Sequence, residues 1–169
     1  KDSKAHFVGT FKTGPAKPRL DVENGLWVVE AGKHFTTWAR NIDTIEVEGA
    51  RIPPEKLGQI AEAIDWWDTE WLDFEELKIT PKKEVMTLSH PRDKWGQVPA
   101  STVPLFDKKA KGVFYLRYHS DDDDSSKAHE LLLNITDLTL VTKLGVKAGL
   151  AWVTRLSSGA PVRGTSIEI

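Results

Sequence analysis

The sequence predicts an all-β protein, an antiparallel β-sandwich in which two sheets are stacked. Three observations predict this fold class. Apolar and polar residues alternate over many short segments, turn residues separate these segments, and helical periodicity is confined to one stretch near position 60. Many short strands between Gly and Pro residues are typical of a sandwich rather than of a helical or βαβ protein.

The expected strands follow one another along the chain. Residues 44–47 have the clearest pattern, because Ile45 and Val47 alternate with Glu46 and Glu48, which predicts one buried and one exposed face. Similar patterns predict further strands at 6–11, 26–29, 35–42, 85–88, 113–118, 131–141, 150–156 and 162–169. Turn residues divide them at 14–15, 24–25, 53–54, 90–91 and 158–159.

One stretch has the periodicity of a helix instead. From Pro54 to Ile64, apolar residues recur at 57, 60, 61 and 64, the spacing of one helix face, and the proline suits a first turn. Trp67 and Trp71 continue this spacing and are expected to seat the helix on a sheet. We therefore expect one or two short amphipathic helices over residues 54–76, inserted between strands.

The aspartates at 121–124 predict a domain boundary. Four adjacent carboxylates repel one another and resist burial, so residues 121–130 are expected to form a solvated acidic linker. Residues 5–120 then make up one sandwich. Residues 131–169 are too few for a second one, since such a domain needs about 100 residues. They are expected to be the first strands of a following, incomplete domain, whose unpaired edge favours a strand-exchanged homodimer.

Composition excludes several classes of function. The 169 residues carry 23 Lys and Arg against 25 Asp and Glu, and this balance argues against a nucleic-acid partner. Acidic groups concentrate in residues 41–80, which hold eleven of them against three basic groups. No apolar run approaches the roughly 18 residues of a membrane span. Because there is no cysteine, disulfides, thiolate chemistry and a thioester in this segment are excluded. Lys1 in place of Met, with no signal sequence, indicates a piece of a longer chain.

No catalytic, cofactor or metal site is predicted. The sequence has no nucleophile elbow, phosphate-binding loop, zinc motif or dinucleotide fingerprint. The aspartate run, flanked by His119 and His129, lacks the alternate spacing and the glycine of a calcium loop, so a solvated linker is the preferred interpretation.

Seven tryptophans leave a carbohydrate-binding module open as the alternative function. Indole faces stack on sugar rings, and a sandwich is a usual host. Trp38 and Trp152 lie within alternating segments, where burial in the core is expected. Trp66 and Trp95 lie next to turn residues and are the candidates for glycan stacking.

Residues 133–140, Leu-Asn-Ile-Thr-Asp-Leu-Thr-Leu, and residues 151–164, Ala-Trp-Val-Thr-Arg-Leu-Ser-Ser-Gly-Ala-Pro-Val-Arg-Gly, closely resemble bacterial alpha-2-macroglobulins. That family typically has "N-x-T-D-L-x-L", a spacer, then "W-V-T-x-L-x-T-G-x-P-V-x-G-A". Ser158 and Thr165 depart mildly from the pattern. Residues 39–57 look like the family's "V-N-V-D-x-V-x-V…R-V-P-x-E-x-L", and residues 111–116 look like "P-G-V-Y-L-V".

The resemblance implies a scaffold segment of a large protease-trapping inhibitor, upstream of its protease-cleavable bait region. The fold expected from it is the macroglobulin type of sandwich, without a catalytic site of its own. Such parents are exported, to the periplasm or outside the cell, and some are inner-membrane lipoproteins. The expected partners are neighbouring macroglobulin domains of the same parent and, through that parent, proteases. No membrane contact by this segment is expected.

Overall fold

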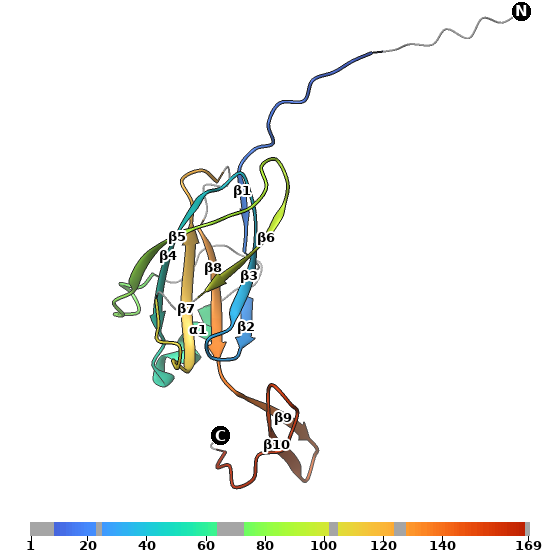
Figure 1. Cartoon of the computed structure of the whole chain (residues 1–169). Coiled ribbons are helices and arrows are strands. Elements are labelled where there is room, and N and C mark those ends of the chain that lie inside the picture. Colours follow the sequence, from blue (N-terminus) through green and yellow to red (C-terminus); the bar gives the residue numbers. More distant parts are fainter. Residues whose placement is uncertain (1–8, 23–24, 64–72, 102–104, 124–127, 168–169) are drawn as a thin grey trace, which may run out of the picture.

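The computed structural model describes residues 9–22, 25–63, 73–101, 105–123 and 128–167. Two sheets pack face to face, and a two-stranded hairpin follows them at the end where the last strand of the sandwich leaves (Figure 1). The all-β sandwich predicted from the sequence is confirmed.

The smaller sheet has three antiparallel strands in the order β1-β3-β6, namely β1 (Arg19–Asp21), β3 (His34–Arg40) and β6 (Gly96–Ser101). Along β3, Phe35, Thr37 and Ala39 point into the core, and the residues between them face outward. Thr37 is a buried polar side chain whose hydroxyl donates a 3.1 Å hydrogen bond to the carbonyl of Val98. This bond lets a threonine occupy a core position without an unpaired polar group.

The larger sheet has five strands in the order β2-β8-β7-β4-β5. Their bounds are β2 (Gly25–Val29), β4 (Thr44–Arg51), β5 (Lys82–Thr87), β7 (Gly112–His119) and β8 (His129–Ile135). All neighbours are antiparallel except β2 and β8, which run parallel. The purely antiparallel sandwich expected from sequence is therefore wrong at this edge. Only residues 22–24 separate β1 from β2, so the chain changes sheet there.

The core lies between the two sheets and is almost entirely apolar. Ile45 and Val47 are buried in it, as their alternation with glutamates predicts. The rings of Phe35 and Tyr118 meet edge to face with centroids 5.4 Å apart. Strand β8 contributes three residues to the same cluster: Leu131, Leu133 and Ile135.

A second apolar cluster covers the opposite face of the larger sheet. A 3₁₀ turn, η1 (Pro54–Lys56), leads into α1 (Leu57–Ala63), which confirms the expected helix over its first ten residues. Ile60 of α1 packs with Phe74, Leu77, Tyr115 and Leu132. Residues 73–79 form hydrogen-bonded turns rather than the helix expected to residue 76. Residues 64–72, which include Trp66, Trp67 and Trp71, lie outside the described residues.

The structure places the expected domain boundary elsewhere. Strand β8 pairs with β7 on one side and with β2 on the other, so residues 131–135 belong to the sandwich and not to a following unit. The described part of the 121–130 segment connects two strands of one sheet. The expected strand at 131–141 is interrupted at residues 136–137, after which the hairpin of β9 (Leu138–Leu144) and β10 (Gly149–Arg155) begins.

Other sequence expectations fail locally. Residues 9–11 of the expected first strand are exposed and pair with no strand in the described part of the chain. Residues 162–167 contain one turn, at 163–164, and no strand. Strands β1 and β6 are not apparent in the pattern. Pro99 lies within β6, where a missing N–H is tolerated because β6 is an edge strand.

Candidate interaction surface

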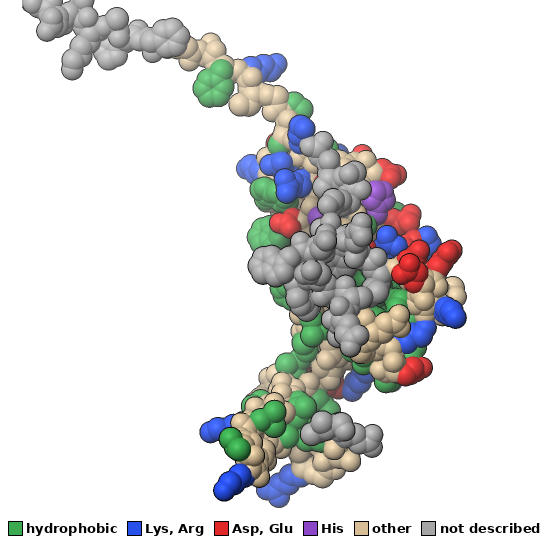
Figure 2. All heavy atoms as spheres, turned by 180° about the vertical axis from the view of Figure 1, so that it is seen from behind, with side chains coloured by type: hydrophobic (Ala, Val, Ile, Leu, Met, Phe, Trp, Pro, Cys, Tyr) green, Lys and Arg blue, Asp and Glu red, His purple; other side chains and the backbone are tan. Residues whose placement is uncertain are grey.

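The hairpin carries apolar side chains on both faces. β9 and β10 pair antiparallel from Leu138↔Arg155 to Leu144↔Gly149. One face presents Leu140, and the other presents Leu150 and Trp152, with 52%, 53% and 48% of these residues exposed. Hydrophobic atoms are visible over this part of the molecule below the sandwich (Figure 2). A lone two-stranded hairpin is marginally stable in water. Exposed apolar residues on both of its faces therefore indicate that other strands or another protein pack against it.

The chain after β10 folds back over one side of the hairpin. Val162 donates a 2.9 Å hydrogen bond to the carbonyl of Val153, and Gly159 and Gly164 supply the left-handed backbone that the turns require, with φ of 67° and 73°. Between this segment and β10 lies a shallow hollow of about 550 Å³, lined mostly by apolar residues that include Trp152 and Ile167.

Two residues join the hairpin to the sandwich. The N–H of Thr136 donates to the carbonyl of Val29 on β2, and its hydroxyl accepts from the N–H of Leu138 at 3.1 Å. The carboxylate of Asp137 pairs with Lys111, and its carbonyl accepts the N–H of Leu156 at 2.8 Å. Residues 133–140 and 151–164, which carry the closer part of the family resemblance, thus include the end of β8, this joint, much of the hairpin and the segment that follows it.

A buried glutamate lies on the face of the larger sheet that also packs against α1. Glu130 is 3% exposed, accepts a 2.6 Å hydrogen bond from the hydroxyl of Tyr115, and lies 3.2 Å from the Nε of Arg117. Burial raises the pKa of Glu130 to about 7, although Tyr115 and Arg117 both act to lower it. Burial, with the hydrogen bond to Glu130, also raises the pKa of Tyr115. Sequence reasoning missed this group, since nothing local marks a glutamate in β8 as buried.

The aspartate run is only partly solvated. The side chain of Asp123 is 2% exposed, because its carboxylate accepts the N–H of Leu20 at 3.3 Å and lies 3.2 Å from Nε2 of His129. His119 pairs in the same way with the exposed Asp121 at 3.0 Å. The expectation of a wholly solvated linker is therefore wrong at Asp123, which ties this loop to β1.

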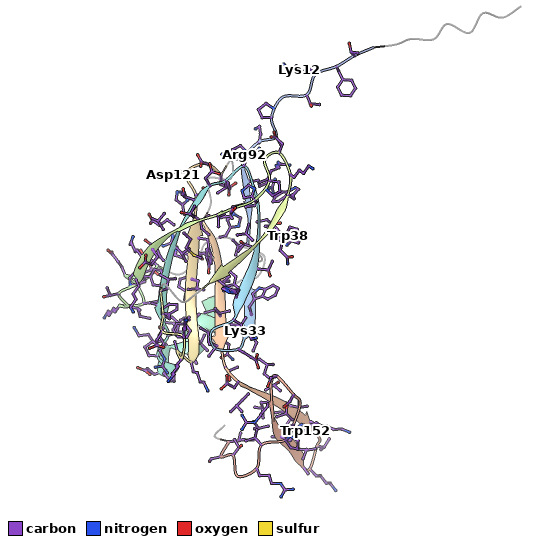
Figure 3. The ribbon with its side chains drawn as sticks, in the orientation of Figure 1. Lys12, Lys33, Trp38, Arg92, Asp121 and Trp152 are labelled. Carbon is purple, nitrogen blue, oxygen red and sulfur yellow. The ribbon has the colours of Figure 1, made fainter. Side chains whose placement is uncertain are left out.

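Tryptophan positions depart from the sequence expectations. Trp38 and Trp152 are 41% and 48% exposed, so the expected burial of both is wrong. They lie on different parts of the molecule, Trp38 on the sandwich and Trp152 on the hairpin (Figure 3). Trp95, the glycan-stacking candidate within the described residues, is exposed, but the guanidinium of Arg40 lies 5.1 Å above its ring. Trp66, the other candidate, is not among the described residues.

Within the described ranges, no group of three or more His, Asp or Glu side chains is arranged to hold a metal ion. No helix in the same residues combines the length and apolarity needed to cross a membrane.

The stacked sheets and their hairpin define the class of the protein, an all-β sandwich, and comparison with solved structures narrows the fold to that of macroglobulin domains. Native alpha-2-macroglobulin from Escherichia coli, in a crystal structure spanning domains NIE-MG1, has a TM-score of 0.71 at 14% identity. This match covers 86% of the present chain and 73% of that one.

Two further structures of the same Escherichia coli protein give similar results. A crystal structure spanning MG0-NIE-MG1 matches with a TM-score of 0.66 at 16% identity, and a cryo-EM reconstruction of the native conformation with 0.69 at 14%. The present chain spans about half (49%) of the former and a tenth (10%) of the latter. No protein-family model matches the sequence, and none of the curated proteins matches it. At these identities the likeness establishes the fold.

Proposed function

We propose that the chain is a scaffold segment of an alpha-2-macroglobulin-like protease inhibitor and has no catalytic site of its own. The hairpin carries this proposal, because Leu140 on one face and Leu150 and Trp152 on the other stay about half exposed, although the chain after β10 buries Val153. The similarity of the fold to three alpha-2-macroglobulin structures supports it, as does the resemblance of residues 133–164 to that family. The comparisons do not favour the carbohydrate-binding alternative.

In this proposal the hairpin opens a second macroglobulin domain, and the remaining strands of that domain cover it. Residues 138–169 then contribute the first strands, and the joint at Thr136 and Asp137 holds the two domains together. The neighbouring domains of the parent are the direct partners, and proteases are met only through the parent. The parent acts in the periplasm or outside the cell.

Protease trapping tests the proposal. A parent chain that encloses a protease blocks its attack on large proteins but not on small substrates. We expect a longer product of the same gene, after exposure to trypsin, to protect casein from digestion while a small amide substrate is still cleaved. Residues 1–169 alone should protect neither substrate. Inhibition of trypsin by residues 1–169, or no protection by any longer product, would contradict the proposal.

Amide exchange tests the domain assignment separately. In residues 1–169 the N–H groups of β9 and β10 should exchange much faster than those of β7 and β8. In a longer product that contains the rest of the second domain, they should become protected. Equal protection of the hairpin and the sandwich in the short chain would show that the hairpin needs no further cover.

A further inference from the structure

The outward face of the smaller sheet carries two exposed tryptophans beside two arginines. Trp38 of β3 faces Asp21 of β1 on one side and Gln97 of β6 on the other. Trp95 immediately precedes β6 and lies against Arg40. The face is the outward side of β1, β3 and the start of β6, and we call it the tryptophan–arginine face. It consists of Arg19, Asp21, Trp38, Arg40, Trp95 and Gln97.

Arg19 and Arg40 are directly opposite in the antiparallel pairing of β1 with β3. Like charges in such a pair destabilise a sheet. Neither arginine forms an ion pair with a carboxylate among the described residues, and the nearby Asp93 instead accepts hydrogen bonds from Ala16 and Asn41. The Nε of Arg40 donates to the carbonyl of Lys17 at 3.0 Å, which fixes its guanidinium over Trp95. Within the described residues the guanidinium of Arg40 is therefore held by a carbonyl and an indole ring and forms no ion pair, although its charge also acts on the nearby carboxylate of Asp93.

These residue types are the ones that contribute most to protein interfaces. Trp and Arg are enriched at binding hot spots, because an indole gives a large rigid contact and a guanidinium binds carboxylates through paired hydrogen bonds. The side chains of Arg19, Asp21 and Gln97 are exposed and form no hydrogen bond within the described part of the chain. Lysines at 17 and 94 are also exposed and add further positive charge nearby.

We propose that the tryptophan–arginine face binds an acidic polypeptide segment, whose carboxylates pair with Arg19 and Arg40 while its apolar groups contact Trp38. Charge complementarity favours this occupant, since an incoming carboxylate would relieve the repulsion between the two arginines. The proposal is independent of the scaffold function. It concerns the opposite sheet from the one that carries the helical cover, and it does not involve the hairpin.

Titration of tryptophan fluorescence with poly-L-glutamate tests the proposal on the full chain. We expect a saturable change that weakens between 0.05 M and 0.5 M salt, because exposed ion pairs are screened. Arg19→Gln should raise the dissociation constant about fivefold. Lys143→Gln, which removes one positive charge from the hairpin, should leave it unchanged. Trp38→Ala should remove most of the fluorescence change, whereas Trp152→Ala should not.

A second measurement separates binding from folding. Because Arg19→Gln removes a like-charge contact, its urea midpoint should equal or exceed that of the unchanged protein while its binding weakens. Equal binding by Arg19→Gln and Lys143→Gln, or no binding at all, would overturn the proposal. So would tighter, Arg19-dependent binding of polygalacturonate, which would identify an acidic glycan, or Arg19-dependent dimerisation in the absence of polymer, which would identify a second copy.

Discussion

Strands β7 and β8 in the sandwich and strands β9 and β10 in the hairpin are similarly apolar, yet the first pair is covered on both faces and the second only in part, at Val153 and Thr154. Strand β7 buries Phe114 and Leu116 against the smaller sheet and Tyr115 under the helical segment. Strand β3, covered on one face, alternates between buried and exposed residues. In the sandwich, a strand with apolar residues on both faces, such as β7, is therefore one that is packed against other elements on both faces. By the same rule the hairpin, with Leu140 on one face and Trp152 on the other, requires covers that lie outside it.

Truncation should change the stability of the protein more than any other test of this difference between the sandwich and the hairpin. A chain ending at Ser120 lacks β8, which pairs with two neighbours and fills the core with Leu131, Leu133 and Ile135. It should remain unfolded. A chain ending at Asp137 lacks only the hairpin and its continuation, and it should keep the cooperative urea transition and near-UV circular dichroism of the sandwich. Folding of both products, or of neither, would contradict the assignment of β8.

Matched leucine substitutions compare covered and uncovered strands directly. Leu133→Ala empties a fully buried position of β8 and should lower the free energy of unfolding by about 2–5 kcal/mol. Leu140→Ala, at a half-exposed position of β9, should change it by less than about 0.5 kcal/mol. Urea unfolding followed by circular dichroism gives both values. A cost of several kcal/mol for Leu140→Ala would show that the hairpin is already covered.

The pH dependence of stability reports on the burial of Glu130 beside Tyr115 and Arg117. The pKa of Glu130 is raised to about 7, so the folded protein holds this proton more tightly than the unfolded chain does. The free energy of unfolding should therefore be greatest below the ordinary pKa of 4.5 and fall as the pH rises to about 7. In Glu130→Gln this fall in the free energy of unfolding, on the order of 1–3 kcal/mol, should be absent.

Urea unfolding from pH 4.5 to 8 measures this difference between the two proteins. Glu84→Gln, an exposed change on β5, is the matched control and should keep the original profile. Parallel profiles for Glu130→Gln and the unchanged protein would mean that Glu130 is solvated in the folded protein.

The smallest effect is expected at the joint. Asp137→Asn removes the exposed ion pair with Lys111, which contributes about 0.2–1 kcal/mol. The urea midpoint of the sandwich should not change, whereas ¹⁵N relaxation should show greater motion of β9 and β10. Lys143→Gln controls for loss of a hairpin charge away from the joint. Unchanged relaxation in Asp137→Asn would indicate that the backbone bonds of Thr136 alone fix the hairpin.

Local pattern predicts much of the fold. Alternation correctly orients Ile45 and Val47, and the spacing from Pro54 to Ile60 correctly identifies the start of the helix. It fails at Trp38 because the core positions of β3 belong to Phe35, Thr37 and Ala39. Size and hydrophobicity favour the tryptophan for a core position, but Thr37 can be buried there because its hydroxyl donates a hydrogen bond to the carbonyl of Val98. That acceptor belongs to a strand the pattern did not reveal.

Long-range pairing explains the remaining failures. The aspartate run has the composition of a linker, and only the contacts of Asp123 with β1 and of β8 with two strands show that the chain returns to the same sheet. The exposed tryptophan–arginine face depends on the register between β1 and β3, which the sequence does not display. Glu130 is buried for the same reason, since Tyr115 and Arg117 reach it from a neighbouring strand.

The parallel contact between β2 and β8 has a consequence for synthesis on the ribosome. It joins Gly25–Val29 to the partners of those residues at 131–135, more than a hundred positions later. Until that last segment leaves the exit tunnel, the nascent chain has an unfilled core and a bare strand edge on β2. Such states are slow to fold and prone to aggregate. The sandwich can therefore complete its core, and lose this tendency, only after nearly all of its residues have been synthesised.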